Sequence, residues 1–193
     1  MRIDIAFADC ARFLDAVFIG GMGCERMLSP RPLRSRPSAH EIVVNVSKAR
    51  TQLTDRLRDS LKRATKEVLI VGWLGRFIIP DLKSCVERGL ELKIVTHKPQ
   101  EAEGTKGAAD KSEAFKELRQ FVKADNVRLL PSCHARIIVV DEKIAFVGSM
   151  DLDSEALAER DEAAIVSDDN EVVAKAREFF GRLFSKGEKP TGW

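Results

Sequence analysis

Apolar positions after the first forty residues follow the periods of alternating helices and strands. Between residues 49 and 64, apolar residues recur at spacings of three and four, which predicts an amphipathic helix. A continuous apolar run at residues 68–71 predicts a strand that is covered on both faces. Residues 80–89 predict a second helix, opened by a proline and closed by a glycine, and residues 90–94 alternate as a second strand. Together these segments predict a β-α-β unit.

The pattern continues with another helix and a series of short strands. After a polar loop, a helix carrying apolar residues at positions 115–122 and a strand at residues 127–130 are expected. Two further strands, at residues 135–140 and 144–148, are joined by a predicted tight turn at residues 141–143.

A short strand at residues 163–166 and a long helix complete the chain. Asp168 is expected to cap the N-terminus of this helix, and its apolar face extends to Leu183. With one more strand at residues 42–46, the elements predict an α/β fold, a mixed but mostly parallel sheet flanked by helices.

The first forty residues differ from the rest. Residues 3–19 are compatible with one helix, but glycines follow it, and residues 29–37 are rich in proline and arginine, which favours an extended linker. We therefore expect an N-terminal appendage and linker at residues 1–40, a domain at residues 41–187, and a short tail at residues 188–193.

Composition places the chain among folded globular proteins. It has 193 residues, of which 44% are hydrophobic and 32% charged, enough for one domain with a proper core. The 32 basic and 30 acidic residues leave a formal net charge of +2, so any case for a polyanionic partner must rest on local clusters of charge.

The sequence contains no apolar stretch of membrane-spanning length. The longest candidate, residues 3–19, is interrupted by aspartates, which also argue against a signal peptide. The four cysteines include no C-x-x-C pair, so neither a disulfide framework nor a zinc knuckle is indicated. We expect a cytoplasmic protein without a stable membrane association, a metal or a cofactor.

Candidate chemistry is concentrated in residues 133–151. His134 and Arg136 are two positions apart at a strand start and project to the same face. The following strand ends in Gly148 and Ser149, and a hairpin would bring His134 and Ser149 together at its open end. An imidazole beside a guanidinium and a hydroxyl suits a phosphoryl group, which the imidazole attacks while the other groups hold its oxygens.

At this segment the sequence resembles the phospholipase D superfamily, whose signature is H-x-K-x4-D-x6-G-S-x-N. His134, Asp141, Gly148 and Ser149 occupy the expected positions at the expected spacing. The resemblance covers roughly residues 47–185 and implies the phospholipase D-like fold.

Two positions depart from the signature. Arg136 stands in place of the lysine, and Asp151 in place of the asparagine. An ionised, unpaired carboxylate about 5 Å from a phosphate oxygen would cost on the order of 3 kcal/mol, unless Arg136 neutralises it.

The resemblance also implies a mechanism without metal. One histidine attacks phosphorus to give a phosphohistidine, and a histidine from a second copy of the motif protonates the leaving oxygen. The chain has one copy, and neither His40 nor His97 lies in a second H-x-[KR] context. A homodimer is therefore expected, with Met150 and Leu152 as candidate interface residues.

Three other residues receive expected roles. Asp141 is expected to close the hairpin turn, even within the functional motif. By resemblance, Glu162 occupies the position of the carboxylate that orients the histidine, although an ordinary charge at a strand edge is the alternative. Lys98 follows a strand end, where it is either a contact to the phosphate backbone or part of a solvated loop.

Two functions from different classes remain open. The first is a metal-independent phosphodiesterase, a hydrolase acting on DNA or RNA, favoured by local clusters of cations. The second is a catalytically silent phospholipase D-like module for dimerisation, or for ligand or nucleic-acid binding, favoured by Arg136 and Asp151. The clustered cations are Arg31, Arg34, Arg36, Lys62, Arg63 and Lys66.

Overall fold

The computed structural model describes residues 40–46, 52–98, 104, 107–131, 133–153, 156 and 159–193. The chain divides into two units, residues 1–36 and 37–193, and every described residue belongs to the second. The helix expected at residues 3–19 and the linker after it lie outside the described residues.

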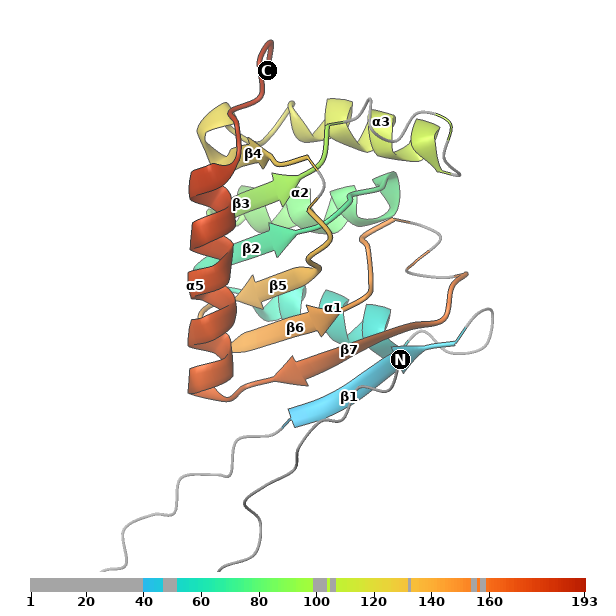
Figure 1. The fold of residues 1–193 in the computed structure, drawn as a ribbon, viewed down its shortest axis with the longest axis vertical. Coiled ribbons are helices and arrows are strands. Elements are labelled where there is room, and N and C mark those ends of the chain that lie inside the picture. Colours follow the sequence, from blue (N-terminus) through green and yellow to red (C-terminus); the bar gives the residue numbers. More distant parts are fainter. Residues whose placement is uncertain are drawn as a thin grey trace, which may run out of the picture. The chain divides into compact units, whose positions relative to one another are not determined.

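The strands form one seven-stranded mixed sheet in the order β1-β7-β6-β5-β2-β3-β4 (Figure 1). Only the β2–β3 and β3–β4 pairs are parallel, and the other four pairs are antiparallel, so the expected predominance of parallel pairs is wrong. The mixed sheet itself is confirmed. The strands are β1 (His40–Asn45), β2 (Glu67–Val71), β3 (Glu91–Thr96), β4 (Val127–Leu129), β5 (Ile137–Val140), β6 (Ile144–Gly148) and β7 (Glu162–Ser167).

Helices cover both faces of this sheet. Core residues of α1, α2 and α3 pack against one face, and those of α5 pack against the other (Figure 1). Successive side chains of a strand point to opposite faces, so in β2 Val68 packs with the first group and Leu69 with the second. The helices are α1 (Gln52–Arg63), α2 (Ile79–Glu87), α3 (Ala108–Leu118) and α5 (Asn170–Lys186), with 3-10 turns η1 (Arg76–Ile78) and η3 (Ala124–Asn126).

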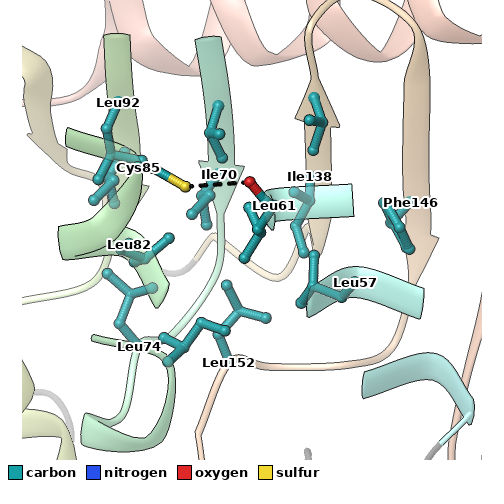
Figure 2. Close-up of a cluster of buried hydrophobic side chains, with 14 of the residues drawn as sticks. Leu57, Leu61, Ile70, Leu74, Leu82, Cys85, Leu92, Ile138, Phe146 and Leu152 are labelled. Carbon is teal, nitrogen blue, oxygen red and sulfur yellow. Dashed lines mark hydrogen bonds between the residues drawn. The ribbon is translucent and has the colours of Figure 1, made fainter. Parts of the chain in front are cut away.

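The larger core lies beneath α1 and α2. Leu53, Leu57 and Leu61 recur every four residues along α1 and are all fully or almost fully buried. Cys85 of α2 is also buried and donates a hydrogen bond from Sγ to the Leu61 carbonyl oxygen at 3.7 Å (Figure 2). Burial raises the pKa of the Cys85 thiol. This cysteine packs as a small hydrophobic residue, as its apolar neighbours in the sequence indicate.

Two local expectations are wrong. Asp169, not Asp168, caps α5, because its side chain accepts hydrogen bonds from the amides of Glu171 and Val172 at 2.9 and 3.0 Å. Met150 and Leu152, expected at an exposed interface, are only 5% and 2% exposed. Their burial arises because the segment after β6 turns back and pairs with residues 73–75.

The last residues of the chain contact the domain. Glu188 and Leu129 exchange backbone hydrogen bonds at 2.9 and 2.8 Å. The Trp193 indole donates a hydrogen bond to the Val122 carbonyl at 2.7 Å and meets the Phe115 ring edge to face. None of the helices in the described part of the chain has the length and apolar character needed to cross a membrane.

Candidate functional site

The hairpin of β5 and β6 brings most of the predicted site residues to one end of the sheet. Ile137 pairs with Val147, and the Gly148 amide donates a hydrogen bond to the Arg136 carbonyl at 3.2 Å. Residues 133–136 enter β5 at the end where residues 148–151 leave β6. His134, Arg136, Ser149 and Asp151 therefore share the open end of the hairpin, and the His134 residue itself is exposed.

Arg136 and Asp151 form a nearly buried ion pair. Both side chains are 12% exposed, and the guanidinium meets the carboxylate through Nε and through an Nη2–Oδ2 hydrogen bond of 3.1 Å. Asp151 Oδ1 also accepts a hydrogen bond from the Trp73 amide at 3.0 Å. The negative charge that replaces the asparagine of the signature is thus matched by the arginine that replaces the lysine.

Ser149 connects the end of β6 with the start of β7. Its hydroxyl donates a hydrogen bond to Glu162 Oε2 and accepts one from the Ala163 amide at 3.3 Å. Glu162 is 8% exposed and is the first residue of β7, so it lies beside the hairpin end. Ser149 and Asp151 therefore have different partners, one facing β7 and the other facing Arg136.

Gly148 is required by the packing of the neighbouring strand. A Cβ at this position would lie 2.1 Å from the Ala163 carbonyl oxygen and 2.6 Å from the Ala164 Cα. A small residue here would also permit a ligand to approach the backbone, which made Gly148 a candidate substrate-binding residue; in the structure, the backbone of β7 occupies this close position.

Asp141 lies at the opposite end of the same hairpin. It accepts hydrogen bonds from the amides of Thr65, Lys66 and Glu67 at 2.8, 2.7 and 3.2 Å, and from the Thr65 hydroxyl at 2.9 Å. Burial raises the pKa of the Asp141 carboxyl, but these hydrogen bonds outweigh burial and hold the pKa below its usual value. Asp141 thereby joins the hairpin turn to the start of β2.

Lys98 is engaged elsewhere. It follows β3, and its ammonium group forms an ion pair with Glu188 at 3.1 Å. Lys98 is therefore paired with a C-terminal residue of the chain. The cation that contacts Asp151 at the hairpin end is Arg136.

A second group of side chains surrounds Trp73, which lies two residues after β2. Trp73 stacks on the buried His97 ring, with centroids 4.3 Å apart and planes 8° apart. The Lys111 ammonium lies 5.2 Å from the centre of the Trp73 ring and forms a buried ion pair with Asp153 at 3.3 Å. Sequence reasoning did not predict this group. The signal was the position of Trp73 and His97 just after two neighbouring parallel strands.

The charges of the site are nearly balanced. Arg136 is paired with Asp151, and a second carboxylate, Glu162, is bound by the Ser149 hydroxyl, so an anionic phosphoryl group needs further positive charge from a protonated imidazole or from another molecule. Within the described ranges, no three His, Cys, Asp or Glu side chains are close enough to hold a metal ion. The arrangement offers an exposed imidazole as nucleophile, with a hydroxyl and a carboxylate nearby.

Comparisons with known proteins identify the family and the fold of the chain. A family model described as cardiolipin synthase, PLD-like domain, matches residues 57–184, more than half of the chain. A comparison of this sequence with the curated proteins found no match.

Three solved structures share the fold. NucT from Helicobacter pylori superposes with a TM-score of 0.62 at 18% identity, over 79% of this chain and 100% of that chain. Nuc from Salmonella typhimurium, a phospholipase D family member, gives 0.63 at 15% identity, over 79% and 98%. TrmBL2, an archaeal chromatin protein, gives 0.52 at 19% identity, over 77% and 54%.

Proposed function

Because the chain belongs to the phospholipase D-like family, we propose that it is a metal-independent phosphodiesterase acting on nucleic acid, with an active site completed by a second copy of the chain. The observation that supports this most strongly is the exposed His134 at the hairpin end, beside Ser149, Glu162 and the Arg136–Asp151 pair. An accessible imidazole beside a carboxylate and a fixed cation is suited to nucleophilic attack on phosphorus.

The reaction has two steps. In the first, a nitrogen of His134 bonds to phosphorus while the bond from phosphorus to the leaving oxygen breaks, and the leaving oxygen takes a proton from the His134 of the second copy. In the second, water attacks the phosphohistidine and gives its proton to that same imidazole, and the N–P bond breaks. The nucleophile and the acid are both regenerated.

The need for a second copy follows from the other histidines in the described residues. His40 lies in β1, where its Nδ1 is 2.8 Å from the Ser167 hydroxyl. His97 is buried against Trp73. Neither lies beside His134 in the sheet, so the acid is supplied in trans.

An exposed apolar surface next to the site fits such a partner. Ile42, Ile165 and Val147 are neighbours across β1, β7 and β6 in the strand register and are 75%, 48% and 38% exposed. We call these three residues the apolar row. Val147 is two residues from Ser149, so a second copy that covers the apolar row comes close to the site.

Nucleic acid is proposed as the substrate because of the local distribution of cations. Lys62, Arg63 and Lys66 are exposed at and just after the end of α1. Arg63 also lines a hollow of about 260 Å³ together with Arg56 and Lys143, and two carboxylates, Asp59 and Asp141, share this lining. Because these cations lie near Asp141, at the end of the hairpin opposite His134, they suit a phosphate backbone that extends along the domain beyond the site.

A subunit-mixing experiment tests the proposal. Purified protein is incubated in EDTA with bis(p-nitrophenyl) phosphate and with DNA or RNA, alone and after exchange with increasing amounts of the His134→Ala variant. Because each active site needs two copies of His134, turnover should fall as the square of the wild-type fraction. His40→Ala serves as the control and should retain turnover. A linear fall, or turnover that survives in pure His134→Ala, would contradict the proposal.

The second candidate is a silent module that binds nucleic acid. It is favoured by the Arg136–Asp151 pair, which leaves little positive charge for a phosphoryl group. TrmBL2, whose structure is described as showing a novel mode of DNA binding, has a similar fold. Binding of DNA without turnover in the same assay would favour this candidate.

A further inference from the structure

We infer that Arg136 is a positioning residue, which holds the loop of the nucleophile in place and does not bind the phosphoryl group. The inference rests on the proposed role of His134 and deepens it. We call residues 133–136 the His134 loop. In the phospholipase D signature a lysine occupies the position of Arg136, and the contacts of the guanidinium differ from those that a lysine can make.

The guanidinium contacts the backbone on both sides of the nucleophile. Arg136 Nη1 donates hydrogen bonds to the carbonyl oxygens of Cys133 at 3.3 Å and of Ala135 at 3.1 Å. These are the two residues that flank His134. The planar group therefore fixes the backbone from which the imidazole projects.

Asp151 anchors the other side of the guanidinium. Its carboxylate takes Nε and Nη2, and is itself held by the Trp73 amide at 3.0 Å. Gly72 leaves room for this pair, since a Cβ there would lie 3.1 Å from Arg136 Cδ and 3.5 Å from Asp151 Oδ1. Gly72 also has a φ of 147°, a backbone conformation that residues with a side chain rarely adopt.

Few donors of Arg136 remain for a ligand. A guanidinium has five N–H groups. In Arg136, Nη1 and Nη2 make three hydrogen bonds to the loop carbonyls and Asp151, and Nε is buried against the same carboxylate. A phosphate that bound this group would have to displace a carboxylate that is only 12% exposed. The two departures from the signature are therefore one coupled change: the fork of an arginine replaces the single charge of a lysine, and an aspartate balances it.

The test is the variant Asp151→Asn, with inorganic phosphate as the probe and two measurements. The first is phosphate affinity by 31P NMR titration, which should become at least about tenfold tighter because the guanidinium loses its competing anion. The second is amide hydrogen exchange in the peptide that spans the His134 loop, which should become at least about tenfold faster because the anchor is weakened.

Asp153→Asn is the matched control. It also removes the charge of an aspartate in a buried ion pair at this end of the sheet, but its partner is Lys111, which lies over the Trp73 ring. Phosphate affinity and loop exchange should both stay at wild-type values. If Asp151→Asn does not fold, Arg136→Lys with Asp151→Asn replaces it, and the same two changes are expected, since a lysine cannot hold both carbonyls.

Unchanged or weaker phosphate binding in the folded variant would overturn the inference, because it would mean that Arg136 already serves the phosphate in the wild type. Unchanged loop exchange would also overturn it. Neither measurement uses turnover. A protein that fails the subunit-mixing experiment but shows both changes refutes the proposed phosphodiesterase and retains the positioning role of Arg136.

Discussion

Gly148 lies against the neighbouring strand so closely that a Cβ on it would be 2.1 Å from the carbonyl oxygen of Ala163. The same contact places the next residue, Ser149, where its hydroxyl reaches Glu162 at the start of β7. Close packing of β6 on β7 is therefore the means by which a motif residue from one strand meets a carboxylate from another.

Gly148→Ala should destabilise the domain. The added methyl group overlaps the backbone of β7, and overpacking of this kind costs about 1–3 kcal/mol or more. Urea unfolding at neutral pH measures the change. The control is Gly181→Ala in α5, where the new Cβ meets no atom within 4 Å. It should raise the free energy of unfolding by about 0.5–1 kcal/mol, because alanine favours the helix. Equal effects of the two substitutions would contradict the argument.

Asp141→Asn should destabilise the domain at neutral pH by about 1–3 kcal/mol, because the asparagine loses the charge to which four hydrogen bonds are made. The folded-state pKa of Asp141 is lowered, so its contribution is complete above the unfolded-state pKa of about 3.9. The contribution is lost as pH falls through the folded-state value. Urea unfolding of both proteins gives their free energies of unfolding. The difference between them should be constant from about pH 5 to about pH 7 and should shrink below about pH 4.

The control for this experiment is Glu87→Gln, which removes an exposed ion pair with Lys83 at 3.9 Å. Exposed pairs contribute little, so its stability should match the wild type across the same pH range. A difference between wild type and Asp141→Asn that grows as pH falls would have the wrong sign for a lowered pKa.

The sequence was sufficient to predict which residues share the hairpin end, because this is a local relationship. Six residues of strand and turn separate Asp141 from Gly148, and a tight turn then brings His134 and Ser149 to the same end of the hairpin. Strand direction was predicted less well. The antiparallel pairing of β5 with β2 depends on contacts between segments about 70 residues apart in the sequence. The hydrophobic periodicity within each segment gives no information on such contacts.

Burial after β6 was missed for the same reason. Leu152 was expected at the surface, yet its amide and carbonyl pair with Trp73 and Gly75 at 2.9 and 2.8 Å. This pairing turns Met150 and Leu152 into the core. The support of Asp151 by the Trp73 amide comes from the same long-range contact, so the geometry of the Arg136–Asp151 pair was also beyond local sequence patterns.

Ile165→Asp should convert the proposed dimer into a monomer and abolish turnover. Ile165 is the middle residue of the apolar row and is 48% exposed, so a charge there disrupts an interface without entering the core. Sedimentation velocity gives the oligomeric state, and thermal unfolding should show little change. Phe179→Ser removes an exposed aromatic ring from α5 and should leave a dimer. A dimer that persists in Ile165→Asp would assign the interface to another surface.

The double variant Arg136→Lys with Asp151→Asn restores both residues of the phospholipase D signature. It should raise phosphodiesterase turnover in EDTA or leave it intact. A lysine without a paired carboxylate can bind the phosphoryl group, whereas the cation of the wild type, Arg136, is paired with Asp151. The His134→Ala change, added to this background, should abolish turnover while the protein stays folded, since His134 is exposed. Turnover in the double variant but not in the wild type would identify Asp151 as the residue that silences the site, and would favour the binding module. If both proteins are folded, dimeric and inactive, the phosphodiesterase proposal fails for reasons beyond these two positions.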